Sequence, residues 1–149
     1  DRGNLRIASS IQEKISVAIH VRFFDDPDRQ EDMSINYYNR AIHIMESQLS
    51  NAHYFVFSDR PEEAAKKIDL PSTRMTLVSH NDGEINAYAD LWLMSLCGHF
   101  IIANSTFSWW GAWLSKSIEK IVIAPSDIDY EINSSITFHS MLLEDWVKC

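Results

Sequence analysis

Two residues that could bind an anionic group, His20 and Arg22, end an apolar segment near the start of the chain. Side chains two positions apart on a strand point to the same side, so these two would share one face. The planar guanidinium group of arginine offers paired N–H donors that match a phosphate. The alternative is structural, with Arg22 in an ion pair with Asp25 or Asp26 and His20 as a core residue.

A second candidate for anion binding is the segment Asn104-Ser105-Thr106-Phe107-Ser108, which follows another apolar run. Small hydroxyl residues at a helix start can cap the helix, or they can offer hydroxyl and backbone N–H groups to an anion. The glycines and the lysine of a P-loop are absent here, so the segment is not that motif. As a bare pattern the segment favours the capping role, with anion binding as the alternative.

Asp90 is a lone carboxylate in a segment whose neighbours Leu91, Leu93 and Met94 are apolar. A carboxylate near a sheet could accept two hydrogen bonds from the edge of a base such as guanine. The alternative is an exposed acid in the first turn of a helix, where the helix dipole favours negative charge. Both interpretations place Asp90 on the helix predicted over 87–97.

The other residues whose types could support chemistry are expected to pack in the core or do not form a recognisable site. Trp109 and Trp113 are four positions apart and would share a helix face, so we expect the run 109–113 to pack in the core rather than to stack on a ligand. The two cysteines have no metal-ligand spacing, the six histidines lack the order of a zinc site, and no serine lies in a G-x-S-x-G turn. The sequence therefore predicts no metal site.

The elements that must position these residues alternate between strands and helices. Apolar, β-branched runs predict strands over 15–22, 53–58, 75–78, 100–103 and 120–124. Helical spacing predicts helices over 35–49, 61–67, 87–97, 108–116 and 140–147. This alternation predicts an open, mostly parallel α/β sheet. Ligands of such sheets bind at the carboxyl ends of the strands, where the polar segments 20–25, 58–60 and 104–110 fall.

Length and composition fit one globular domain, with 149 residues, 46% hydrophobic and 23% charged. Thirteen basic against twenty-one acidic residues give a net charge of −8, which argues against a nucleic-acid binder, since that needs a basic face. An anionic ligand must then be held by a few local cations and backbone N–H groups. The start at Asp1 is neither a methionine nor a signal peptide, so we expect further residues upstream.

Several segments together carry a family resemblance. The first strand leads into His20-Val21-Arg22, then Phe55-x-Phe57-Ser58-Asp59 follows, and the segment 89–114 runs from Ala89-Asp90-Leu91 through Asn104-Ser105-Thr106 to Trp113-Leu114. Over residues 15 to 126 the chain resembles glycosyltransferase family 11, the bacterial GDP-L-fucose-dependent α-1,2-fucosyltransferases. The family pattern H-x-R-R-G-D reads His20-Val21-Arg22-Phe23-Phe24-Asp25 here, so the first arginine is present while phenylalanines replace the second arginine and the glycine.

The resemblance implies an architecture. Family members fold as two Rossmann-like halves that face a cleft, known as the GT-B type, and the matching segments belong to the carboxyl-terminal, donor-binding half. It follows that residues 1–149 are one Rossmann-like GDP-sugar-binding domain, and that the amino-terminal, acceptor-binding half is lacking. The implied location is the cytoplasm, with peripheral association at the inner membrane surface as an alternative for the full enzyme.

The resemblance also implies a reaction, the inverting transfer of L-fucose from GDP-β-L-fucose to a hydroxyl of a galactose-containing glycan. Arg22 would pair with the β-phosphate, and Asp25 is the nearest carboxylate for a general base. His20 and Asp90 would hold the guanine or its ribose. The full set of residues implied to bind the donor is His20, Arg22, Asp90, Asn104, Ser105, Thr106 and Ser108. We expect no cofactor and no metal, because Arg22 and backbone N–H groups would stabilise the leaving GDP.

Two alternatives remain at this point. One is a transferase of the same fold that uses another nucleotide sugar, which a screen of donors would separate. The other is a non-catalytic module that binds nucleotide sugars, an interpretation that Phe23 and Phe24 suggest. Such a module would bind GDP-fucose yet show no turnover even as a full-length protein.

Overall fold

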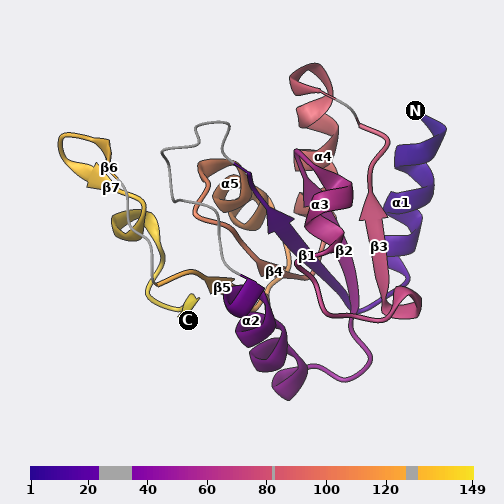
Figure 1. Ribbon diagram of the computed structural model, residues 1–149, viewed down its shortest axis with the longest axis horizontal. Coiled ribbons are helices and arrows are strands. Elements are labelled where there is room, and N and C mark those ends of the chain that lie inside the picture. Colours follow the sequence, from indigo (N-terminus) through magenta and orange to yellow (C-terminus); the bar gives the residue numbers. More distant parts are fainter. Residues whose placement is uncertain (24–34, 82, 127–130) are drawn as a thin grey trace.

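The fold centres on a parallel sheet of six strands in the order β3-β2-β1-β4-β5-β8 (Figure 1). The computed structural model describes residues 1–23, 35–81, 83–126 and 131–149. The strands of this sheet are β1 (Ser16–Val21), β2 (His53–Ser58), β3 (Met75–Val78), β4 (His99–Ile101), β5 (Val122–Ala124) and β8 (Val147–Lys148). All five pairings between them are parallel, so the predicted open α/β sheet is confirmed. The order is that of a Rossmann-like sheet.

Helices cover both faces of the sheet (Figure 1). One face is covered by α1 (Arg2–Gln12), α4 (Ala87–Leu96) and α5 (Thr106–Leu114), and the other by α2 (Ile35–Gln48) and α3 (Pro61–Ala65). The alternation of side chains along β1 feeds both cores, because Val17 and Ile19 pack with α2 while Ala18 packs on the opposite side. His20 therefore points to the side of α4 and α5.

The strand order reverses between β1 and β4. From β1 the chain adds β2 and then β3 in one direction, and it returns to add β4 and β5 in the other. β1 pairs with β2 through Val21, but its pairing with β4 ends at Ile19 and Ile101. The carboxyl ends of β1 and β4 therefore separate, and in open α/β sheets ligands bind in a crevice at such a point.

Most predicted elements lie within two residues of the observed ones, and the strands over 53–58 and 75–78 match at both ends. The helix predicted over 108–116 begins earlier, at Thr106, so Asn104 and Ser105 directly precede its first turn. Helix α1 was not predicted. It is stabilised by Asp1, whose carboxylate accepts the N–H groups of Gly3 and Asn4.

The helix predicted over 140–147 is wrong. This region instead forms a short 3₁₀ helix (His139–Met141) and then β8, which pairs with β5 at the edge of the sheet. The N–H of Cys149 donates to the carbonyl of Ala124 at 3.1 Å, and the Trp146 ring lies 6.0 Å from that of Trp109. Pairing at the sheet edge and aromatic burial outweigh the weak local preference for a helix. Ahead of this region, β6 (Glu131–Asn133) and β7 (Ile136–Thr137) form a separate hairpin.

The tryptophan-rich segment is only partly in the core. Trp109 is buried, as expected, whereas Trp110 and Trp113 are 47% and 48% exposed. Trp113 stacks on Trp109 with ring centroids 5.3 Å apart. Gly111 lets α5 approach α4 closely, because an added Cβ would lie 3.2 Å from the Cβ of Met94. None of the helices in the described part of the chain has the length and apolar character needed to cross a bilayer.

Candidate functional site

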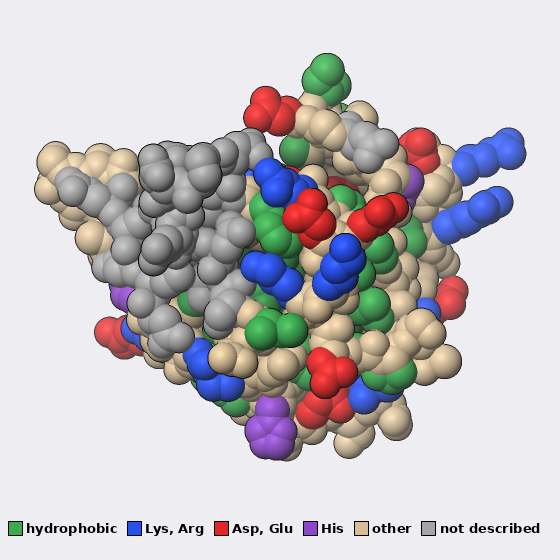
Figure 2. Space-filling view, viewed as in Figure 1, with side chains coloured by type: hydrophobic (Ala, Val, Ile, Leu, Met, Phe, Trp, Pro, Cys, Tyr) green, Lys and Arg blue, Asp and Glu red, His purple; other side chains and the backbone are tan. Residues whose placement is uncertain are grey.

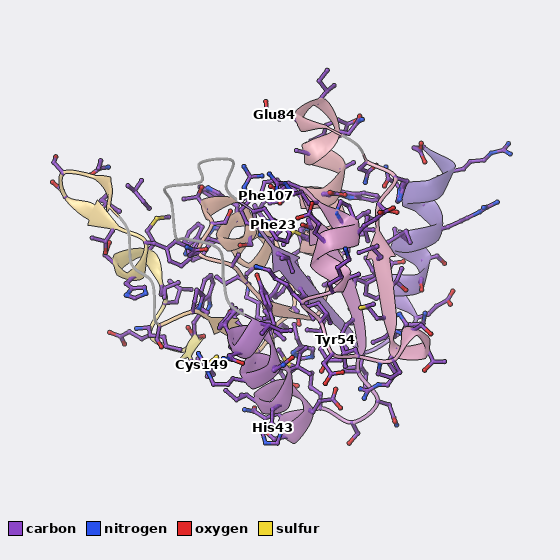
Figure 3. All side chains as sticks on the ribbon, viewed as in Figure 1. Phe23, His43, Tyr54, Glu84, Phe107 and Cys149 are labelled. Carbon is purple, nitrogen blue, oxygen red and sulfur yellow. The ribbon has the colours of Figure 1, made fainter. Side chains whose placement is uncertain are left out.

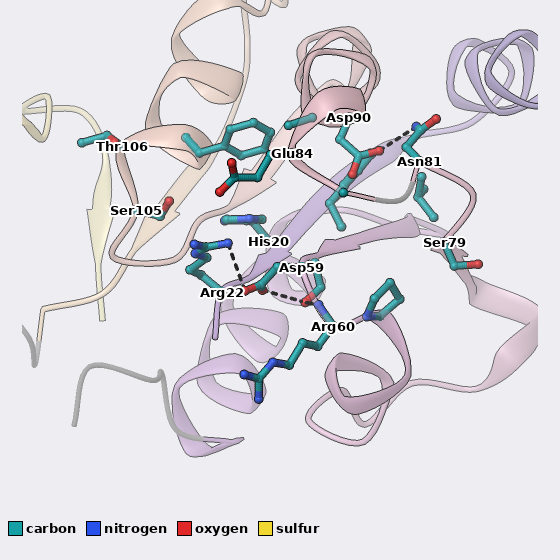
Figure 4. A pocket seen from close by; sticks show the side chains of 17 residues that line it. His20, Arg22, Asp59, Arg60, Ser79, Asn81, Glu84, Asp90, Ser105 and Thr106 are labelled. Atoms are coloured by element: carbon teal, nitrogen blue, oxygen red, sulfur yellow. Dashed lines mark hydrogen bonds and ion pairs between the residues drawn. The ribbon is translucent and has the colours of Figure 1, made fainter. Parts of the chain in front are cut away.

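A pocket of about 550 Å³ lies at the carboxyl ends of the central strands, on the side of α4 and α5 (Figure 4). It receives side chains from the ends of β1, β2 and β3 and from the starts of α4 and α5. Figure 2 shows acidic and basic side chains next to one another over α3 and the end of β1. The polar and charged residues that line the pocket are His20, Arg22, Ser58, Asp59, Arg60, Ser79, Asn81, Glu84, Asp90, Ser105 and Thr106.

Arg22 lies just beyond β1 and is held by Asp59 at the end of β2. Its Nη1 is 3.0 Å from Oδ2 of Asp59, and the other carboxylate oxygen of Asp59 accepts the N–H of Phe23 at 3.0 Å. One carboxylate thus fixes both the guanidinium and the backbone that carries it. The Arg22 side chain remains 39% exposed and accessible from the pocket. Asp25 and Asp26, the partners considered from the sequence, lie outside the described residues.

His20 is a neutral, buried side chain in the wall of the pocket. It is 4% exposed, and its ring centroid lies 5.4 Å from that of Phe107. Burial and, to a lesser degree, the charge of Arg22 lower the pKa of His20 to about 3. Its Nδ1 has no hydrogen-bond partner among the described residues.

We expect His20 to stay neutral well below the range in which an ordinary histidine takes up a proton. In the unfolded chain it would titrate near 6.5, so stability should fall as the pH drops below that value, by about 1.4 kcal/mol per pH unit until the folded pKa is reached. Imidazole nitrogen shifts measured by NMR should still report the neutral ring at pH 5.5. A titration midpoint of His20 near 6.5 would contradict this account.

Asp90 lies in the first turn of α4 and is held from the loop after β3. Its Oδ1 accepts the side-chain amide of Asn81 at 2.8 Å, and Asn81 exchanges two hydrogen bonds with Asn4 of α1. Burial raises the pKa of Asp90, while the hydrogen bond from Asn81 and the charge of His80 act in the opposite direction. The site therefore contains a partly buried carboxylate with a fixed orientation.

The segment 104–108 divides between the pocket and the interior. Ser105 and Thr106 line the pocket at the start of α5, whereas Asn104 and Ser108 are fully buried and do not line it. Ser108 Oγ donates to the carbonyls of Ser105 and Ala103, at 3.1 and 3.4 Å. Ser105 is the residue before the helix, but its side chain makes no capping bond to a described residue. The binding roles of all four residues remain predictions.

Three carboxylates or amides of the pocket had no predicted role, namely Asp59, Asn81 and Glu84. Asp59 was in a polar segment at a strand end, which is the signal that could have found it. Glu84 follows Gly83, whose φ of 77° lies in the left-handed region that favours glycine, and it begins a short 3₁₀ helix (Glu84–Asn86). Asn81 owes its position to contacts with α1, which no local pattern reveals.

The pocket has two chemically different ends (Figure 4). Arg22, Ser105 and Thr106 lie at one end, together with the first backbone N–H groups of α5. Asp90 and Asn81 lie at the other, with His20 and Glu84 between them. Among the described residues, no group of three or more histidine, cysteine or acidic side chains is placed to hold a metal ion.

Comparison with known proteins gives a consistent assignment. An alpha-1,2-colitosyltransferase of Escherichia coli is 37% identical over 120 residues, covering 74% of this chain and 40% of that protein. The O-antigen biosynthesis glycosyltransferase WbnK of Escherichia coli is 38% identical over 93 residues, covering 62% of this chain and 30% of that protein. The chain thus spans less than half the length of these relatives.

The fold is shared with a solved fucosyltransferase. The crystal structure of Se-Met fucosyltransferase NodZ from Bradyrhizobium superposes with a TM-score of 0.51 at 17% identity, over 76% of this chain and 41% of that one. This likeness concerns the fold alone. The sequence profile of Glycosyl transferase family 11 matches residues 2–149. Because that match extends over all but the first residue, the chain belongs to glycosyl transferase family 11.

Proposed function

We propose that this chain is the donor-binding domain of a longer glycosyltransferase and that its donor is GDP-L-fucose. The whole enzyme would transfer L-fucose, with inversion, to a hydroxyl of a galactose-containing glycan. The observation that carries the proposal is the polarity of the pocket, with a cation and N–H donors at one end and a fixed carboxylate at the other. GDP has the complementary polarity, because its phosphates accept hydrogen bonds while the guanine edge donates them.

The Arg22 end suits the diphosphate. A guanidinium can form paired, charge-assisted bonds to phosphate oxygens, and the N-terminus of α5 adds backbone N–H groups and a favourable dipole. Ser105 and Thr106 lie at that helix start and offer hydroxyl donors. As the bond to the sugar breaks, negative charge grows on the leaving GDP, and these groups would stabilise it most in the transition state.

The Asp90 end suits guanine. A carboxylate accepts hydrogen bonds, and guanine presents two adjacent N–H donors, at N1 and N2, that one carboxylate can bind together. Asn81 fixes the orientation of Asp90 through the bond to Oδ1, so little order has to be gained when the base binds. Uracil lacks this pair of donors, so the end of the pocket at Asp90 would select against uridine nucleotides.

Glu84 is a carboxylate that lies between the two ends of the pocket (Figure 4). A general base must lie within hydrogen-bond reach of the acceptor hydroxyl. Asp59 is already paired with Arg22, and Asp90 with Asn81, so Glu84 joins Asp25 as a candidate for this role. In the full-length protein, Asp25→Asn and Glu84→Gln separate the two candidates by their effect on kcat.

The sugar and the linkage rest on the resemblance and on one relative. The relative described as an alpha-1,2-colitosyltransferase supports an α-1,2 linkage and makes colitose a second candidate for the transferred sugar. The chain covers 40% of that protein, so we expect most contacts to the acceptor to come from parts of the enzyme outside these residues. The rate of sugar transfer by the full-length enzyme should be the same in excess EDTA as in the presence of Mg²⁺.

Calorimetry of the 149-residue chain with GDP, GDP-fucose, GDP-colitose and UDP tests the proposal. We expect the guanine nucleotides to bind about 30- to 150-fold more tightly than UDP, because uracil lacks the adjacent pair of N–H donors that Asp90 would accept from guanine. Equal binding of GDP and UDP, or no binding, would contradict the donor assignment. Efficient fucosyl transfer by this chain alone would contradict its role as one part of a larger enzyme.

Binding without turnover is a second candidate, and Phe23 favours it. This residue replaces the second arginine of the family pattern, and its ring is buried between Lys67 Nζ, 4.7 Å from the ring centroid, and the Arg60 guanidinium, at 5.6 Å. A buried phenyl ring cannot contribute charge to a leaving diphosphate. Turnover by the full-length protein with GDP-fucose or GDP-colitose would exclude this candidate.

A further inference from the structure

We propose that Tyr38 of α2 is a positioning residue for the donor site, because its hydroxyl holds the end of β1 at the point where this strand leaves the sheet. Tyr38 is not one of the described residues that line the pocket, and it acts through the backbone of His20, two residues before Arg22. Where the inference concerns GDP, it rests on the proposed function. It adds to the proposed donor site a residue that lies beneath the pocket.

The first step concerns the hydrogen bonds of β1. The N–H of Gly98 donates to the carbonyl of Ser16, which places this carbonyl on the side of β4. Carbonyls alternate along a strand, so the carbonyl of His20 lies on the same side. The pairing of β1 with β4 ends at Ile19 and Ile101, so His20 presents the next acceptor beyond the last pair. Tyr38 Oη donates to this carbonyl at 3.0 Å.

The second step concerns the opposite wall of the crevice. Tyr37, the preceding residue of α2, donates its hydroxyl to the carbonyl of Ile102, directly after β4, and lies 3.3 Å from that of Ile123 in β5. Both tyrosines are fully buried, and their rings meet edge to face at 5.0 Å. Adjacent residues of one helix therefore hold the two strand ends that separate to form the crevice.

The third step connects Tyr38 to Arg22. The segment 20–23 is held at its start by Tyr38, through the His20 carbonyl, and at its end by Asp59, through the N–H of Phe23. Without the hydroxyl of Tyr38 a buried carbonyl loses its donor, so the backbone must shift to regain one. A shift here changes the direction of the Arg22 guanidinium relative to α5, and paired bonds to phosphate depend strongly on that direction.

Tyr38→Phe tests the proposal, with Tyr54→Phe as the matched control. Tyr54 is also a fully buried tyrosine, but its hydroxyl donates to Glu46, and it lies near the amino end of β2, at the opposite end of the strands from Phe23 and Phe107 (Figure 3). Both variants should unfold at lower urea concentration than the wild type. Only Tyr38→Phe should weaken GDP binding, by about tenfold, while Tyr54→Phe should change it less than about twofold.

A second readout does not depend on GDP. The Nε–H signal of Arg22, assigned with Arg22→Lys, should show a reduced heteronuclear NOE in Tyr38→Phe and an unchanged one in Tyr54→Phe. If the wild type does not bind GDP, the donor assignment fails, and this NMR comparison still decides the positioning role. Wild-type GDP affinity together with an unchanged Arg22 signal in Tyr38→Phe would overturn it. Should that variant not fold, 4-fluorophenylalanine at position 38 keeps the volume without the donor, and the same outcomes apply.

Discussion

Arg22→Ala should weaken the binding of GDP by about 2–4 kcal/mol, which is roughly a 30- to 1,000-fold increase in Kd. Two effects add. The variant lacks the charged donor for the diphosphate, and it leaves the carboxylate of Asp59 in the pocket without the guanidinium that is 3.0 Å away in the wild type. The end of the pocket that binds phosphate would then be negative. Calorimetry at fixed salt concentration measures the change.

The matched variants separate charge from geometry. Arg22→Lys keeps the charge but loses the planar pair of donors, so it should restore only part of the affinity. Arg22→Ala combined with Asp59→Asn should bind GDP better than Arg22→Ala alone, because the exposed carboxylate is gone. Arg6→Ala, an exposed residue of α1, controls for the loss of one positive charge from a chain of net charge −8. GDP affinity within twofold of wild type in Arg22→Ala would remove Arg22 from the site.

The sheet could be predicted from the sequence because its strands carry their own signal. The run 53–58 is apolar on both faces, as a central parallel strand must be, and polar residues bound it at both ends. The region 140–147 lacked such a signal. Residues 147–149 become extended only because the backbone groups along the outer side of β5 can pair with them. This contact joins segments more than twenty residues apart in the chain. Helix α1 was missed because it depends on burial of Ala8 and Ile11 against the rest of the fold.

The candidate site could be predicted where one rule of topology sufficed. His20 lies near the carboxyl end of β1, and Arg22, Ser105 and Thr106 follow parallel strands, so their meeting at the carboxyl end of the sheet needs only the strand order. The orientation of their side chains could not be predicted. Arg22 depends on a carboxylate thirty-seven residues later in the chain, and Asp90 on an amide that is itself held by α1. The support of the site is made of long-range contacts, which leave no local pattern.

Asp90→Asn should weaken the binding of GDP by about 2–3 kcal/mol and leave the binding of UDP unchanged. An asparagine side chain can accept one hydrogen bond from the guanine edge, but its amide N–H groups would face the second guanine donor, so one bond is replaced by a repulsive contact. The preference for GDP over UDP should therefore be nearly abolished. Asp69→Asn, an exposed carboxylate away from the pocket, is the control for the loss of one negative charge.

The pH dependence of the ratio between the Kd values for GDP and for UDP supplies an independent test of the role of Asp90. Burial raises the pKa of Asp90 in the free protein, and two N–H donors from guanine would favour the charged form and lower that pKa again. GDP binding should then release protons, and its affinity should fall as the pH drops through the raised pKa of the free protein. UDP shares the phosphate chemistry, so titration of the phosphates and of groups near Arg22 changes both Kd values, and their ratio isolates Asp90.

Asn81→Ala removes the hydrogen bond that holds the pKa of Asp90 down, so in that variant the GDP preference should be lost at a higher pH than in the wild type. A GDP-to-UDP ratio that does not change with pH in either protein would exclude Asp90 from base recognition.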